Sequence, residues 1–115
     1  MLNCVSPVYE VVSGQILLGQ QKEFVRLHRE VLLQLMRDAD IQPFLCLFTE
    51  LGRYARFLDI YQYPSLSEYG RRTDALLTDP RIDDYYARIS KCIEGSIQVE
   101  LAVEFTHLAG INAAV

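Results

Sequence analysis

The chain has 115 residues, the size of one domain whose core buries about two thirds of the unfolded surface. Half of the residues are hydrophobic, which is too many for a disordered protein. The net charge of −4, without any basic run, argues against nucleic acid or an anionic membrane as partner. The start, MLNCVSP, lacks a secretion signal pattern, and no segment approaches the ~20 apolar residues of a membrane span. We therefore expect a soluble cytoplasmic protein.

The cysteines and histidines do not indicate a metal site. Cys4, Cys46 and Cys92 are an odd number without metal-ligand spacing. Cys46 lies in an apolar run and Cys92 on an apolar helix face, so both are expected to be small core residues in a reducing compartment. His28 and His107 are isolated, and no nucleophile elbow, phosphate loop or dinucleotide fingerprint is present. We expect no metal and no cofactor.

The first half of the chain predicts three strands and one helix. Val8 to Ile16 carries β-branched residues and predicts the first strand. After Gly19, apolar residues at helical spacing predict a helix; they are Phe24, Leu27, Val31 and Leu35. Phe44 to Glu50 and Ala55 to Tyr63 are expected to be the second and third strands, with a turn between them.

The second half begins with two helix start signals. Ser65 and Glu68 fit a capping box, in which each side chain bonds the other residue's backbone amide. Asp79 as N-cap and Pro80 at the first helical position predict another helix. Its buried stripe is expected to be Ile82, Tyr85, Ile89 and Ile93.

The order of elements predicts the fold class. Gly95 is expected to end the last helix, and clean alternation from Ser96 to Thr106 predicts a half-buried fourth strand. The order β-α-β-β-αα-β is typical of an α+β protein, a ferredoxin-like four-stranded antiparallel sheet with its helices on one face. We expect one domain over residues 1–115, with a core at 8–106 and a tail at 107–115.

The second sheet face needs a cover. The run from Phe44 to Phe48 is apolar on both faces, as is much of the third strand, which is more exposed apolar surface than a monomer usually tolerates. A homodimer packed through its sheet faces satisfies this requirement. The small apolar tail from Leu108 to Val115 either lies across the partner or stays in solvent.

The chain resembles the NIPSNAP family over roughly residues 8 to 106. Family features appear in order: a Tyr-Glu first strand at Tyr9-Glu10, Gly19 before a helix containing Glu23-Phe24, and the run FTELG at 48–52 with one residue fewer than usual. They continue with Tyr63, Ser65-Leu66, Arg71-Arg72, Leu76, Asp79-Pro80 and Tyr85.

The resemblance has departures as well as implications. Tyr61 stands where the family usually has tryptophan, Gln62 replaces an acid, and Ile82 replaces an aromatic residue; the chain has no tryptophan. The resemblance implies a dimeric α+β barrel. That wider class holds cofactor-free oxygenases, haem-dependent degraders, polyketide cyclases and isomerases, among which fold alone does not choose.

Acidic residues on the strands are the first candidate catalytic groups. Glu10 and Asp59 belong to strands that are neighbours in this topology, although alternation does not fix whether they share a face. Together with Glu100 or Glu104 they would form an acid cluster, in which like charges raise a carboxyl pKa as a general acid or base requires. The alternative is that each acid faces solvent or pairs with an arginine; the arginines considered are Arg53, Arg56, Arg71 and Arg72.

A histidine and several tyrosines complete the candidate site. His28, at the border of the apolar helix stripe, is either an acid-base group or haem ligand in the helix-sheet cleft, or a partly exposed residue bonded to a neighbour. Tyr61 is the fourth catalytic candidate, and dense tyrosines suit a cleft for an aromatic ligand, although Tyr69 and Tyr85 fit ordinary packing. The candidate ligand-binding residues are Tyr63, Phe48, Arg72 and Ile82.

Two functions remain open. One is a cofactor-free oxygenase, cyclase or isomerase that acts on a small, fairly apolar or aromatic molecule, with Glu10, Asp59, His28 or Tyr61 as acid-base groups. The other is a non-catalytic homodimeric binding or assembly module. Polar groups enclosed in a cleft favour the first, and acids paired with arginines in a filled cleft favour the second.

Overall fold

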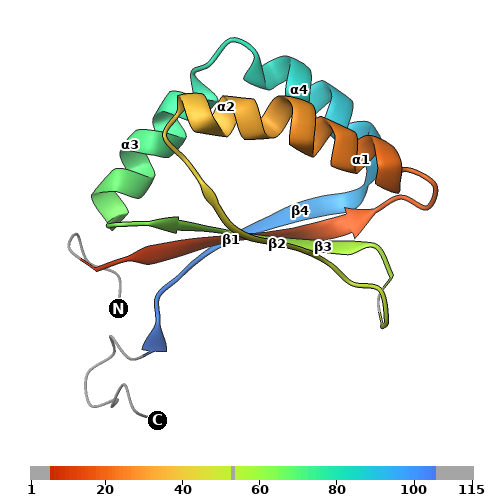
Figure 1. Cartoon of the computed structure of the whole chain (residues 1–115), viewed down its shortest axis with the longest axis horizontal. Helices are drawn as coiled ribbons and strands as arrows, with labels where there is room; N and C mark the ends of the chain where they lie inside the picture. The colour runs from red at the N-terminus through yellow and green to blue at the C-terminus, as the bar shows by residue number, and fades with distance from the viewer. Residues whose placement is uncertain (1–5, 53, 106–115) are drawn as a thin grey trace.

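The computed structural model describes residues 6–52 and 54–105 of the chain and contains one four-stranded antiparallel sheet in the order β2-β3-β1-β4. All the helices lie on one side of the sheet (Figure 1). The elements are β1 Val8–Ile16, α1 Gln21–Leu27, η1 His28–Leu32, α2 Leu33–Asp38, β2 Pro43–Phe48, β3 Arg56–Tyr63, α3 Leu66–Leu77, α4 Ile82–Ile89, η2 Ser90–Cys92 and β4 Ile93–Ala102. The predicted α+β, ferredoxin-like arrangement is confirmed.

The register of the sheet decides which side chains face the helices. In the antiparallel pair of β1 and β3, Val12 lies opposite Asp59 and Glu10 lies opposite Tyr61. Asp59 and Tyr61 are buried beneath the helices, and alternate residues of a strand share a face. Glu10 and Asp59 therefore share the helix-facing side, which the sequence alone left open. Glu100 lies opposite Val11 and belongs to the other side.

The first helix is continuous from Gln21 to Asp38 but widens in the middle into a π-helical segment, η1, at His28–Leu32. The sequence predicted a uniform helix here. The apolar stripe is buried as expected at Phe24, Leu27 and Leu35. These side chains belong to one hydrophobic core together with buried residues of the sheet and of the other helices. Single π turns inside α-helices are rare and occur often at functional sites. His28 is the first residue of this turn.

The start of α3 agrees only in part with the predicted capping box. The Ser65 hydroxyl accepts a hydrogen bond from the Glu68 amide at 3.2 Å, as predicted. The Glu68 carboxylate does not return the bond; it accepts from the guanidinium groups of Arg71 and Arg72 instead. Two strong charged donors on the same helix face take the place of the single backbone amide.

The start of α4 was predicted too early. The helix begins at Ile82, and Pro80 lies in the preceding turn. The Asp79 carboxylate accepts a hydrogen bond from the Arg81 amide at 2.9 Å and also binds the Arg81 guanidinium, so it stabilises a turn before the helix. The predicted stripe is confirmed, since Ile82, Tyr85, Ile89 and Ile93 are all buried.

Two backbone positions with positive φ correct other boundaries. Gly95 was predicted to end a helix, but it has φ +74° inside β4, where the pairing with β1 shifts register. An L residue rarely adopts this conformation, which explains the glycine. Ala55, predicted as the first residue of the third strand, has φ +62° and ends the turn, so β3 begins at Arg56.

The predictions for the cysteines, for the fourth strand and for the tail have different outcomes. Cys92 is buried, as predicted, but Cys46 is exposed and does not belong to the core. The fourth strand was predicted to be half-buried, but Ile97 and Val99, which line the space between sheet and helices, remain 41% and 55% exposed, so this prediction is wrong for them. The tail at 107–115, including His107, lies outside the described residues.

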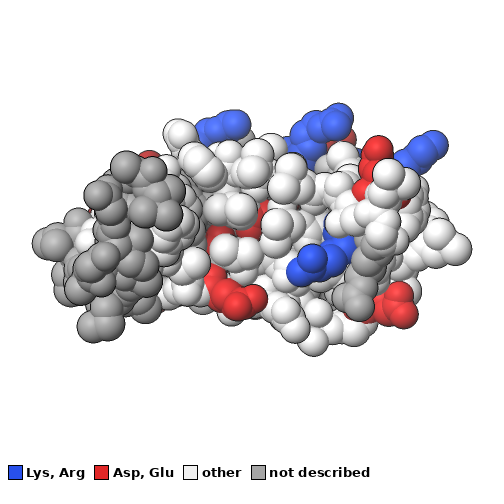
Figure 2. All heavy atoms as spheres, turned by 90° about the horizontal axis from the view of Figure 1, so that it is seen from below, with Lys and Arg blue, Asp and Glu red and all other residues white. Residues whose placement is uncertain are grey.

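Part of the sheet face opposite the helices is apolar, where β2, β3 and the middle of β1 lie side by side. Leu45 pairs with Ile60 and Leu47 with Leu58 on this side, and Val11 lies beside Ile60. Leu45 and Leu47 are each 45% exposed. Figure 2, which views the molecule from the sheet side, shows mostly uncharged surface with a few acidic and basic groups. We name these five residues the open sheet face.

Within the described residues, no helix is long and apolar enough to cross a membrane.

Candidate functional site

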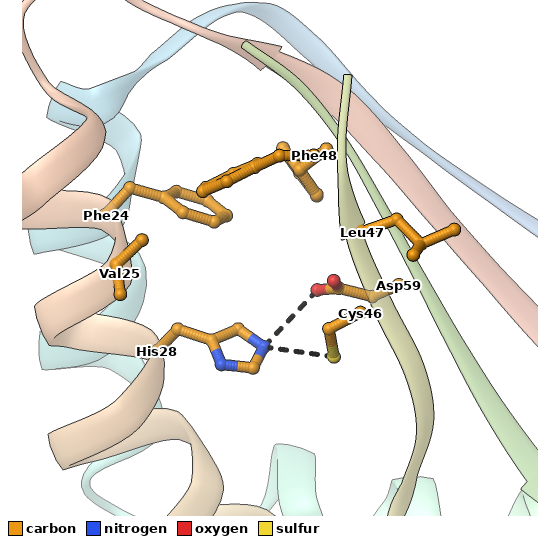
Figure 3. A pocket seen from close by; sticks show the side chains of 8 residues that line it. Phe24, Val25, His28, Cys46, Leu47, Phe48 and Asp59 are labelled. Atoms are coloured by element: carbon orange, nitrogen blue, oxygen red, sulfur yellow. Dashed lines mark hydrogen bonds and ion pairs between the residues drawn. The ribbon is translucent and has the colours of Figure 1, made fainter. Parts of the chain in front are cut away.

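Three polar side chains from three elements meet at one corner of the space between the helices and the sheet. His28 Nε2 lies 3.5 Å from Asp59 Oδ2 and 3.8 Å from Cys46 Sγ (Figure 3). They line a cavity of about 150 Å³ whose other walls include Phe24 and Phe48. A polar group of three in an aromatic setting is a candidate for chemistry or for ligand binding.

The sheet register and the helix position bring these residues together. Cys46 of β2 lies directly opposite Asp59 of β3, so both side chains project from the helix-facing side of the sheet. Figure 3 shows the His28 ring reaching across from the helix toward both of them, while Leu47 points away to the other side of β2. The His28 and Asp59 side chains are only 15% and 7% exposed.

Asp59 is the centre of this polar group. Its Oδ2 faces His28 Nε2 and also accepts a hydrogen bond from the Tyr61 hydroxyl at 3.2 Å. Burial, together with the nearby Asp59 carboxylate, raises the pKa of Tyr61 far above its usual range. The phenol therefore stays neutral and acts as a donor to the carboxylate.

Cys46 is a thiol rather than a thiolate in this state. Burial of the sulfur and the neighbouring Asp59 raise the pKa of Cys46 to about 12. Because the thiolate is the reactive form, Cys46 is a poor nucleophile at neutral pH.

A larger cleft of about 330 Å³ continues along the sheet from this corner. Phe24, Phe57 and Asp59 line both spaces, so the Asp59 carboxyl stands in the wall between them. The cleft is otherwise mostly apolar, with Ile82 and Tyr85 on the helix side. Its volume lies at the small end of the range of ligand pockets, roughly 300–1,000 Å³.

Glu10 adds a second carboxyl to the larger cleft. Its Oε1 accepts a hydrogen bond from the Tyr63 hydroxyl at 3.0 Å. Burial raises the pKa of Glu10, and the hydrogen bonds from Tyr63 and Tyr69 only partly oppose this effect. The carboxyl therefore holds its proton to higher pH than an exposed glutamate, and in that form it can donate a hydrogen bond to a ligand.

The four predicted catalytic residues lie in this region, but they form two groups. Asp59 contacts both His28 and Tyr61, whereas Glu10 accepts a hydrogen bond from Tyr63. No arginine in the described ranges lies within ion-pair distance of either acid, so the arginine-paired alternative is not seen there.

The predicted ligand-binding residues are divided between the cleft and its surroundings. Phe48 lines the smaller cavity and Ile82 the larger cleft. Tyr63 is fully buried and lines neither space, although it supports Glu10. Arg72 lines a separate surface depression and pairs with Glu68, and it does not line the cleft.

Sequence reasoning missed Cys46 as a site residue. Its position as the third residue of the predicted second strand gave no local sign of its neighbour, because the partner Asp59 is set by strand register. A hairpin register drawn from the short turn between β2 and β3 would have placed residues 46 and 59 side by side. The π-helical turn at His28 had no signal in the sequence.

A comparison with models of protein families identifies the family of the chain. The NIPSNAP model matches residues 9–103, which is most of the chain and contains all the site residues above. The chain belongs to the NIPSNAP family. The resemblance inferred from the order of motifs is thereby confirmed. A comparison with curated proteins found no match.

Solved structures of NIPSNAP proteins share the fold. An uncharacterized NIPSNAP-like domain protein from Burkholderia xenovorans aligns with a TM-score of 0.78 at 15% identity, covering 90% of this chain and 89% of that one. A NIPSNAP family protein from Agrobacterium tumefaciens aligns with a TM-score of 0.75 at 22% identity, covering 84% and 91%. A putative antibiotic biosynthesis monooxygenase from Nitrosomonas europaea aligns at 0.68 and 9% identity, covering 93% and 97%. At these identities the likeness concerns the fold alone.

Proposed function

We propose that this NIPSNAP protein binds a small, largely apolar molecule in its helix-sheet cleft and moves a proton on it with the His28–Asp59 pair. The observation that carries the proposal is the position of Asp59, a buried carboxyl that lines both spaces and faces an imidazole at 3.5 Å. Carboxylate-imidazole pairs in closed sites are common acid-base groups.

The chemistry of the pair suits removal of a proton from an activated carbon or hydroxyl. The proton of the substrate passes to the pair, and the negative charge left on the substrate is stabilised by hydrogen bonding. Return of the proton to another atom gives an isomerisation, attack of the anion on a carbonyl within the molecule gives a cyclisation, and reaction with O2 gives an oxygenation. All three reactions begin with removal of a proton from the substrate. We therefore propose this proton transfer and leave open which of the three reactions follows it.

Glu10 is suited to hold the far end of the ligand. Burial raises the pKa of its carboxyl, which lies in the same cleft as Asp59. In the protonated form it donates a hydrogen bond to a ligand oxygen, while the surrounding apolar walls bind the rest of the molecule. We therefore propose an aromatic or polyketide-like ligand with one or more oxygen groups.

Deuterium exchange tests the proton transfer. The probe is 2-tetralone, an enolisable aromatic ketone, incubated in D2O with wild-type protein, Asp59→Asn or the matched control Asp84→Asn, whose carboxylate is exposed on α4. Chelator is present throughout. We expect accelerated deuterium uptake with wild type and with the control. The rate with Asp59→Asn should be lower by at least about 100-fold, since a positioned base contributes about 10²–10⁴-fold. Uptake that Asp59→Asn leaves unchanged would refute the role of the pair.

A non-catalytic homodimeric module is the second candidate. It is favoured by the open sheet face, where Leu45 and Leu47 are each 45% exposed in one chain and the other three residues are partly buried. We propose that two copies pack through this face in either case. Binding of a small molecule without any proton exchange would support this candidate over the first.

Light scattering on a sizing column tests the dimer. We expect about twice the chain mass of 13.2 kDa for wild type at micromolar concentration. Leu58→Glu places a charge on the open sheet face and should give the monomer mass. The matched control Leu18→Glu alters an 87% exposed loop residue and should remain dimeric. A monomer mass for wild type would contradict the dimer.

A further inference from the structure

We propose that His28, Cys46 and Asp59 form a binding site for one divalent transition metal ion of the Zn²⁺ or Co²⁺ class. The ligand atoms are His28 Nε2, Cys46 Sγ and an Asp59 carboxylate oxygen, which all lie within 4.8 Å of one another. The three residues come from a helix and two strands, so their spacing in the sequence does not indicate a metal site. The site shares His28 and Asp59 with the proposed acid-base pair, but its test requires no turnover.

The two distances measured from His28 Nε2 are close to those of a metal-bound set. Tetrahedral zinc with ordinary bond lengths separates a nitrogen and an oxygen ligand by about 3.3 Å, and a nitrogen and a sulfur ligand by about 3.6 Å. Here Nε2 lies 3.5 Å from the Asp59 oxygen and 3.8 Å from the Cys46 sulfur. Each pair needs to close by only about 0.2 Å, which is within the reach of side-chain rotation.

Charge balance favours a divalent ion in this apolar setting. On binding, the Cys46 thiol loses its proton to solvent, so the ion meets one thiolate, one carboxylate and one neutral imidazole. The two negative charges neutralise the ion, which avoids leaving net charge among Phe24, Phe48 and the other apolar walls. Imidazole and thiolate select zinc, cobalt or copper over Mg²⁺ and Ca²⁺, which prefer oxygen ligands.

The surroundings supply a supporting group and an open position. The Tyr61 hydroxyl donates to Asp59 Oδ2 at 3.2 Å and orients the carboxylate. Three protein ligands leave the fourth tetrahedral position free, and the cavity of about 150 Å³ beside them has room for water or a ligand oxygen. A bound ion also occupies the lone pair of His28 Nε2, so the ion and acid-base use of that nitrogen exclude each other.

Titration with Co²⁺ provides the direct test, because a cobalt-thiolate bond gives a charge-transfer absorption and tetrahedral cobalt gives intense visible bands. The full chain is used after removal of any affinity tag and dialysis against chelator, and Mg²⁺ serves as the negative control. Zn²⁺ stoichiometry is measured in parallel by elemental analysis. We expect one ion per chain, displacement of Co²⁺ by Zn²⁺ and no competition from Mg²⁺.

Two cysteine variants identify the ligand. Cys46→Ser should lose the charge-transfer band and weaken binding by more than about 100-fold, since even supporting groups beyond the ligands cost about 10–100-fold. Cys46 is exposed on an edge strand, so this variant should fold normally. Cys92→Ser, the matched control, should keep the band. Tyr61→Phe should weaken binding by about 10-fold.

The outcomes separate this site from the proposed function. Absence of cobalt binding by wild type, or binding and absorption unchanged in Cys46→Ser, would overturn the metal site. These measurements use no organic ligand, and the deuterium exchange uses chelator, so either proposal can fail alone. If Zn²⁺ displaces Co²⁺, with loss of the cobalt charge-transfer band, and also stops deuterium uptake in a parallel assay without chelator, both proposals are supported.

Discussion

A methyl group added at Gly14 tests the packing at the wall between the two cavities. An alanine Cβ there would lie 2.8 Å from Phe57 Cε1 and 3.0 Å from Cζ, and 3.5 Å from Ile97 Cγ1. Ordinary contact begins near 3.4 Å, so the Phe57 ring must retreat by about 0.6 Å. The ring is buried and borders both cavities, so they offer space into which it can move.

Two opposing effects determine the stability of Gly14→Ala. Overpacking costs about 1–3 kcal/mol, while replacing glycine in a strand returns about 0.5–1 kcal/mol of backbone entropy. We expect a net loss of about 1 kcal/mol, near 4 °C in Tm for a chain of this size, and weaker binding of a cleft ligand. Gly70→Ala is the matched control, because Gly70 lies inside α3 with nothing within 4 Å of an added Cβ. It should gain about 0.5–1 kcal/mol.

Urea denaturation at equal protein concentration measures both variants. A gain in stability for Gly14→Ala equal to that of Gly70→Ala would show that Phe57 is not held against the strand as described. Unchanged ligand binding together with the stability loss would show that the ring moves away from the cavities.

Three further variants test other contacts. Ser65→Ala removes the acceptor for the Glu68 amide and should cost about 1 kcal/mol in urea denaturation; a change within error would mean that water replaces the cap. Glu10→Gln removes a carboxyl whose pKa is raised by burial, so the stability of wild type relative to this variant should be highest below the ordinary pKa of 4.5 and fall as pH rises through the raised value. Denaturation curves from pH 4 to 8 measure this difference, and a difference that grows with pH would contradict the burial. Tyr61→Phe should cost about 1–2 kcal/mol, because Asp59 loses a buried donor; equal stability would argue against that bond.

The fold was predictable because its signals are local. Strand alternation and helical spacing depend on neighbouring residues, and the range Val8–Ile16 was predicted for β1 and observed. The misplaced boundaries lie where two local signals compete. In the sequence, Asp79 fits both a helix N-cap and a turn. Because α4 begins at Ile82, the bond from the Arg81 amide to the Asp79 carboxylate stabilises a turn before the helix.

The site was predictable only in some of its members. Glu10 and Asp59 were chosen for their chemistry, but their common face follows from the pairing of β1 with β3, which joins residues far apart in the chain. Cys46 was assigned to the core because an apolar run looks buried, whereas β2 is an exposed edge strand. The π-helical turn that begins at His28 also depends on packing that no local pattern records.

Native mass spectrometry tests the central claim that the cleft holds a small molecule. Protein purified under non-denaturing conditions is compared with Val99→Trp, which places a large side chain at the exposed edge of the cleft. We expect a wild-type mass increased by one small organic molecule per subunit, and the bare chain mass for Val99→Trp. A bare mass for wild type, or the same adduct on both proteins, would contradict it.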